Sequence, residues 1–175
     1  MGQRQRHLMA IFTAALAVSS CVGSEPRRES GSLNCVTYRG EVVSLARTYR
    51  DFDEYKEDPK NLPPRELERV ARLVREAPVP RSFKSRGDAF QTLRDLAFPG
   101  YGFGGDRRGD AVALFTLEIP LKAEARRIAV EERDGDWWVV DDFLWPTARG
   151  ELARAERVGD HLVYFGYDGT PLREQ

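Results

Sequence analysis

The first half of the chain carries apolar residues at helical spacing. A first stripe recurs at steps of three and four residues and predicts a helix over residues 37–57. Its members are Val42, Leu45, Ala46, Tyr49 and Phe52. Pro63 and Pro64 then suit the start of a second helix, which ends before Pro78. A third, shorter helix is expected to begin near Asp88, as its N-cap, and to stop at Pro99.

The second half of the chain alternates apolar and polar positions with the period of strands. Residues 111–119, "AVALFTLEI", predict one strand. Residues 125–145 predict a hairpin, because Asp134-Gly135 is a two-residue turn signal between two strand-like runs. Residues 151–158 and 161–167 predict a further antiparallel pair. Helices followed by antiparallel strands predict a single α+β domain over residues 35–175, with N-terminal helices packed on one face of the sheet.

The N-terminus differs from the rest, because an apolar run from Leu8 to Val18 follows two arginines and stops at Cys21. As a helix its eleven residues cover roughly 16 Å, against about 30 Å of bilayer hydrocarbon. The length and charge predict a signal peptide over residues 1–20. Two alternatives stay open: an ordinary secretory signal in which Cys21 has no special role, and a buried helix of a cytosolic protein.

The end of this run, "VSSC", resembles the lipobox of bacterial lipoproteins. The resemblance implies that Cys21 is lipidated, with palmitate among its acyl chains, and becomes the mature N-terminus in the cell envelope. Two or more acyl chains give stable anchoring without any other membrane-binding element. In such lipoproteins an Asp directly after the lipidated Cys retains the protein at the inner membrane, and here that position is Val22. The resemblance therefore implies attachment to the outer membrane, facing the periplasm, in a cell that has an outer membrane. Residues 21–34 are expected to be a flexible tether.

Composition excludes several classes of function. Without residues 1–20 the formal charge is −3, which gives no electrostatic footprint for nucleic acid. Besides Cys21, residues 21–175 contain one histidine, His161, and one cysteine, Cys35. These are too few ligands for a zinc site rich in nitrogen or sulfur, so we expect none. No cofactor is indicated either. Once Cys21 is lipidated, Cys35 is expected to be buried or paired with another chain.

Three further motifs do not indicate chemistry. "GYGFGG", at 100–105, has the spacing of a dinucleotide-binding loop but follows a helix and precedes a strand, so we interpret it as a flexible turn. "RGD" occurs at 86–88 and 108–110, and we assign these copies to a helix start and a loop rather than to adhesion. The aspartates at 51, 53 and 58 lack the spacing of a calcium loop.

The hairpin sequence "VEERDGDWWVVDDF", residues 130–143, together with the element order, resembles the nuclear-transport-factor-two-like (cystatin-like) fold. That resemblance implies a curved antiparallel sheet wrapped around the helices. The additional hairpin after Trp145 departs from the simplest version of this pattern.

The same hairpin holds the weak catalytic candidates. Asp141 and Asp142 are expected to point to opposite faces of a strand. In enzymes of the resembled superfamily a carboxylate in an apolar pocket acts as general base, and His161 is a possible partner for it. The alternative places the aspartate at a strand edge and the histidine in a turn. Of Trp137 and Trp138, one is expected in the core and the other at a pocket wall or an exposed binding surface.

These observations predict a non-catalytic envelope lipoprotein whose domain binds an envelope protein or a small ligand, of unknown identity, through the concave face of the sheet. One alternative is a small enzyme of the isomerase or hydrolase-like kind that uses Asp141 or Asp142 with His161. Another is an inhibitor or immunity-type lipoprotein. A deep apolar cavity with a carboxylate at its base would favour the enzyme, and a filled or shallow concavity would favour binding.

Overall fold

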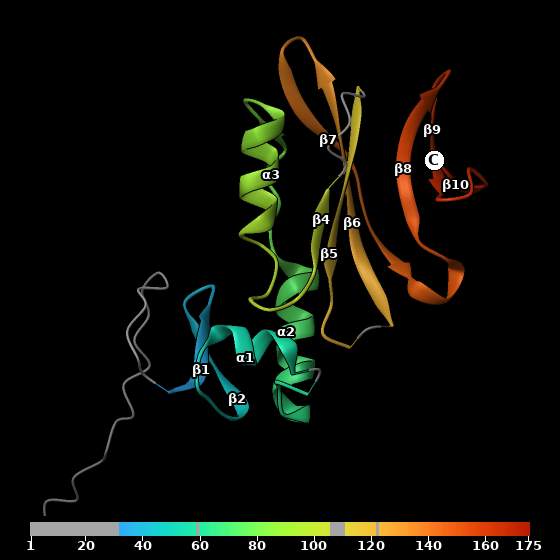
Figure 1. Cartoon of the computed structure of the whole chain (residues 1–175). Coiled ribbons are helices and arrows are strands. Elements are labelled where there is room, and N and C mark those ends of the chain that lie inside the picture. Colours follow the sequence, from blue (N-terminus) through green and yellow to red (C-terminus); the bar gives the residue numbers. More distant parts are fainter. Residues whose placement is uncertain (1–31, 59, 106–110, 122) are drawn as a thin grey trace, which may run out of the picture.

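The computed structural model describes residues 32–58, 60–105, 111–121 and 123–175. The expected signal peptide, Cys21, most of the tether and the second RGD copy lie outside these residues. The class is α+β, as the sequence predicts. Figure 1 shows α3 on one side of a curled five-stranded antiparallel sheet and strands β8–β10 on the other. Within the described residues, no helix is both long enough and apolar enough to cross a membrane.

The chain begins with a hairpin, so the helix expected over residues 37–57 is wrong. Strands β1 (Leu33–Tyr38) and β2 (Glu41–Tyr49) pair antiparallel, and only α1 (Phe52–Glu57) is helical. Arg39 and Gly40 form the turn with φ of 52° and 79°, a backbone conformation that closes two-residue hairpins. Cys35 lies half-buried on β1. Thus β1 begins within the segment expected to be a tether.

The other two helices lie where the sequence predicts them, although the third ends at Arg94 rather than at Pro99. Helix α2 (Pro64–Glu76) has Pro64 in its first turn and ends before Pro78. Strand β3 (Ser82–Phe83) separates it from α3 (Arg86–Arg94). The N-cap of α3 is Ser85 rather than Asp88. The Ser85 hydroxyl accepts from the Asp88 amide at 3.0 Å, and the Asp88 carboxylate accepts from the Lys84 amide at 3.0 Å. The first RGD copy is therefore the first turn of a helix.

The larger sheet has the strand order β3-β7-β6-β5-β4. Its hairpin turn is the predicted one, because Asp134 and Gly135 have φ of 54° and 84°. The register of β7 slips where Val139 faces Val130 and Asp141 faces Ala129, which leaves Val140 as a bulge. The remaining strands are β4 (Phe103–Gly105), β5 (Val112–Glu118), β6 (Glu124–Arg133) and β7 (Asp136–Pro146).

After a short 3-10 turn, η1 (Thr147–Arg149), the chain forms a three-stranded sheet of order β10-β9-β8. Its hairpin, β8 (Leu152–Val158) with β9 (His161–Gly166), agrees with the predicted antiparallel pair. Strand β10 (Pro171–Glu174) was not predicted, since four mostly polar residues give no clear alternation.

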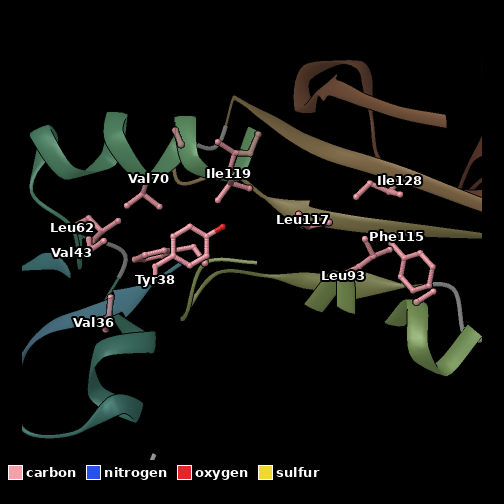
Figure 2. Packing of buried hydrophobic residues seen from close by; sticks show 14 of the residues in the cluster. Val36, Tyr38, Val43, Leu62, Val70, Leu93, Phe115, Leu117, Ile119 and Ile128 are labelled. Carbon is pink, nitrogen blue, oxygen red and sulfur yellow. The ribbon is translucent and has the colours of Figure 1, made fainter. Parts of the chain in front are cut away.

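Apolar side chains gather on both faces of the larger sheet. On one face Phe115 and Ile128 pack with Leu93 of α3, in a cluster that continues through Val70 of α2 to the N-terminal hairpin (Figure 2). On the other face a smaller cluster joins the sheet to β8 and β9. Its buried members are Val112, Leu114, Ala129, Trp145, Leu152, Ala155, Leu162 and Tyr164. The central sheet is therefore covered on both sides.

Candidate functional site

Asp142 belongs to a structural ion pair on the helix-facing side of β7. Its two oxygens accept from Nε and Nη2 of Arg126 at 2.8 and 2.6 Å. Nη1 of Arg126 donates to the carbonyls of Val74 and Ala77 at 3.0 and 2.7 Å, where α2 ends. The Arg126 side chain is 9% exposed, so its charge depends on these acceptors rather than on water. Asp142 thus helps to attach α2 to the sheet.

Asp141 belongs to a different structural cluster, on the other side of the sheet. Its carboxylate is buried and accepts from the Tyr164 hydroxyl at 2.6 Å and from Arg173 Nη2 at 3.1 Å. Arg173 also stacks over the ring of Phe143, 3.5 Å from its centroid. Burial, and then the hydrogen bond to Asp141, raise the pKa of Tyr164. These contacts attach β9 and β10 to β7.

His161 is not brought to either aspartate. Its side chain is 62% exposed, and its Nδ1 lies 3.5 Å from a carboxylate oxygen of Glu174, across the β9–β10 pair. Asp141 and Asp142 each have other partners on opposite faces of β7. Within the described residues, therefore, the acid–base pair considered from the sequence is not assembled.

The two tryptophans divide as expected. Trp137 is 9% exposed and belongs to the helix-side core, where the Arg86 guanidinium lies 5.7 Å from its ring centroid. Trp138 is 41% exposed. It lines a shallow groove of about 480 Å³ together with the Pro78–Pro80 segment that follows α2. Trp137 is thus a core residue, and Trp138 remains the candidate for a binding surface.

A larger cleft, of about 880 Å³, opens on the face of the larger sheet that β8 covers. Strand β4, the second half of β5 and the start of β6 form one wall, and the start of β8 with the end of β9 forms the other. The side chains of Leu114, Ala125 and Leu152 give it an apolar lining, and Glu118 and Glu151 are exposed residues of its lining.

Arg127 lines this cleft and is only 7% exposed. Its Nη1 donates to the Thr116 hydroxyl and, at 3.4 Å, to the Leu152 carbonyl, while its Nε is buried without an acceptor. In the described part of the chain no carboxylate lies within ion-pair distance of Arg127. Burial lowers the pKa of Arg127, and the more distant charge of Glu151 acts in the opposite direction. A largely uncompensated positive charge is costly to bury, so this position needs an explanation.

The glycine-rich run 100–105 forms the β4 wall of the cleft. A side chain at Gly102 would place its Cβ 2.5 Å from the Glu118 carboxyl carbon, and one at Gly105 would place it 2.6 Å from the Phe115 ring. At Gly104 the nearest neighbour would be Thr116 Cβ, at 4.0 Å. Phe103–Gly105 is therefore an edge strand in close contact with β5, and the turn expected from the sequence is confined to the start of the run, where Gly100 has a φ of 85°.

Metal and phosphate chemistry receive no support from the described residues. Asp51 caps α1 by accepting from the Glu54 amide at 2.9 Å. Among the residues that the structure describes, no group of three or more His, Cys, Asp and Glu side chains is arranged to hold a metal ion. What the cleft presents to a ligand includes the buried guanidinium of Arg127, the Thr116 hydroxyl, apolar side chains and the exposed carboxylates of Glu118 and Glu151.

Comparison with known proteins adds no assignment. The sequence matches no protein-family model and no curated protein, and the fold matches no solved structure. Arguments about function therefore depend on the geometry above.

Proposed function

We propose that the chain is an envelope lipoprotein whose α+β domain is a non-catalytic binding or accessory module, tethered to the membrane through Cys21. The cleft on the β8-covered face of the larger sheet is the proposed ligand site. The observation that carries the proposal is the buried Arg127 at this cleft, because it offers a fixed positive charge and hydrogen-bond donors to a ligand.

The roles of the acid–base candidates favour binding over catalysis. Asp142 accepts hydrogen bonds from Arg126, and Asp141 accepts them from Tyr164 and Arg173. Both carboxylates therefore hold elements of the fold together. Neither lines the larger cleft. A general base must reach the proton that it abstracts, either directly or through one water molecule. The described geometry gives these carboxylates no such position in the cleft.

The anchor is part of the proposal and is testable by itself. We expect wild-type cells to incorporate radioactive palmitate into the protein, and the Cys21→Ala variant to be unlabelled and released from the membrane fraction. Mass spectrometry of the mature N-terminal peptide identifies the modification. A disulfide between Cys21 and Cys35 would consume the thiol that the lipid needs, so finding that bond in the mature protein contradicts the anchor.

The fold-level resemblance also stays part of the proposal. This part of the proposal is supported by two helices separated by β3 and followed by four antiparallel strands, β4–β7. The N-terminal hairpin and the added sheet β8–β10 depart from the simplest version of that order. The proposed ligand site lies between the core sheet and this added sheet.

The binding role is tested by complementation of a deletion strain. We expect His161→Gln, which changes only an exposed side chain, to restore the deletion phenotype fully. Gly104→Val should not, because it places a side chain into the cleft. Trp138→Ala tests the second surface and should complement if the cleft is the site. Failure of the His161 variant at normal protein level, with Gly104→Val fully active, would refute the proposal.

A further inference from the structure

We propose that the cleft binds a carboxylate group, which pairs with the guanidinium of Arg127. This inference rests on the proposed binding function and specifies the chemical class of its ligand. Arg127 lines the cleft, is 7% exposed, and among the described residues has no carboxylate within ion-pair distance. An acidic ligand would supply the negative charge that the described residues do not place beside Arg127.

The preceding residue on the same strand shows what a satisfied buried arginine requires in this protein. Arg126, the preceding residue on β6, is equally buried, and two carboxylate oxygens of Asp142 and two helix-end carbonyls accept from it. Arg127 has one hydroxyl and one carbonyl, both bound to Nη1. Its Nη2 has no acceptor in the described residues, so donors remain for a ligand. Carboxylates bind guanidinium groups through paired hydrogen bonds.

Charge selects a carboxylate over a phosphate. A monoester phosphate carries about −1.5 to −2 charges at neutral pH, whereas a carboxylate carries one. The cleft supplies one buried positive charge, and its exposed lining includes the carboxylates of Glu118 and Glu151. The other lining arginine, Arg154, is already paired with Glu156 at 2.5 Å. A second negative charge on the ligand would therefore be repelled.

The walls of the cleft suit the remainder of such a ligand. Leu114, Ala125 and Leu152 offer apolar surface beside Arg127, and Gly104 leaves open space above Thr116. A ligand with a carboxylate at one end and an apolar body fits this distribution. Small-molecule sites combine apolar surface with polar groups that fix the orientation of the ligand.

The probe for the test is propionate, which carries the carboxylate and a short apolar body. The full-length protein in detergent is titrated, and the Nε–H and backbone amide signals are followed by NMR. We expect saturable shifts at Arg127 and Thr116 with propionate, none with the neutral analogue propionamide, and weaker ones with inorganic phosphate. Absence of saturable shifts with propionate, or stronger binding of phosphate, overturns the proposal.

Three variants locate the site. Arg127→Gln should weaken propionate binding by about tenfold or more, the effect of losing hydrogen bonds to a charged group. Gly104→Val should weaken binding similarly with Arg127 intact, and it decides the case if the Arg127 variant fails to fold. Arg50→Gln, the control away from the cleft, should change affinity by less than about threefold, because Arg50 is 82% exposed and its pair with Asp51 lies on the surface. Wild-type binding by Gly104→Val contradicts the site. If Gly104→Val fails to complement although propionate does not bind, the binding function stands and the ligand class is wrong.

Discussion

Asp142→Asn should destabilise the fold rather than remove a chemical step. The substitution keeps the size of the side chain but removes its charge and replaces one acceptor by a donor that faces the guanidinium of Arg126. Breaking a fully buried ion pair by removing one partner costs about 3–5 kcal/mol. Here the Asp142 side chain is 30% exposed and Arg126 keeps two carbonyl acceptors, so we expect about 1.5–3 kcal/mol, the range for hydrogen bonds to charged groups.

The assay is urea unfolding followed by tryptophan fluorescence, with Asp136→Asn as the matched control. Asp136 pairs with Lys84, whose side chain is 87% exposed, and exposed pairs contribute about 0–1 kcal/mol. Arg126→Met combined with Asp142→Leu should recover part of the loss, because a buried pair replaced by apolar groups is often neutral. If Asp142→Asn loses no more stability than the control, the pair does not attach α2 to the sheet and the reasoning fails.

Two further predictions concern the core and acid stability. Trp137→Ala should cost about 3–5 kcal/mol in denaturant unfolding and Trp138→Ala much less, and equal losses would contradict one-sided burial of this strand end. Arg157 of β8 pairs with Glu131 and lowers the pKa of this carboxyl. The pair therefore contributes its full stabilisation of the fold above the ordinary pKa of 4.5, and this contribution is lost as the pH falls through the lowered pKa. Unfolding midpoints from pH 7 to 3 should therefore fall less steeply for Glu131→Gln than for the wild type, and parallel curves would refute this.

Local signals predicted the second half of the fold well because each hairpin carries its own turn residues. Asp134-Gly135 adopts positive φ at both positions, which few other residue pairs do at low cost. The same argument explains the error over residues 37–57. Arg39-Gly40 closes a hairpin with the same backbone geometry. The helix was predicted instead because apolar residues in this segment also happen to recur at helical spacing. Val42, a member of that stripe, is 50% exposed, whereas Val43 is fully buried, as a strand requires.

The bulge in β7 was beyond sequence reasoning and changes what the candidate residues do. Without it, Trp137, Val139 and Asp141 would share one face of the strand. The extra residue at Val140 moves Asp141 to the opposite face, where Tyr164 meets it. Sequence alternation alone therefore assigned opposite faces to the two aspartates correctly, but it had no means of naming their partners, which come from elements far along the chain.

The candidate site was missed because sequence does not distinguish one arginine from another. Arg126 and Arg127 are adjacent letters in a strand rich in arginine and glutamate, and both are buried. They differ in what opposes them: one faces a helix end and Asp142, and the other faces the added sheet and a cleft that supplies no paired carboxylate. A buried charge that is paired with an opposite charge has a structural role that needs no ligand. A charge buried without a partner among the described residues, at a cleft, is suited to an acidic ligand, and that difference is the physical ground for placing the ligand at Arg127.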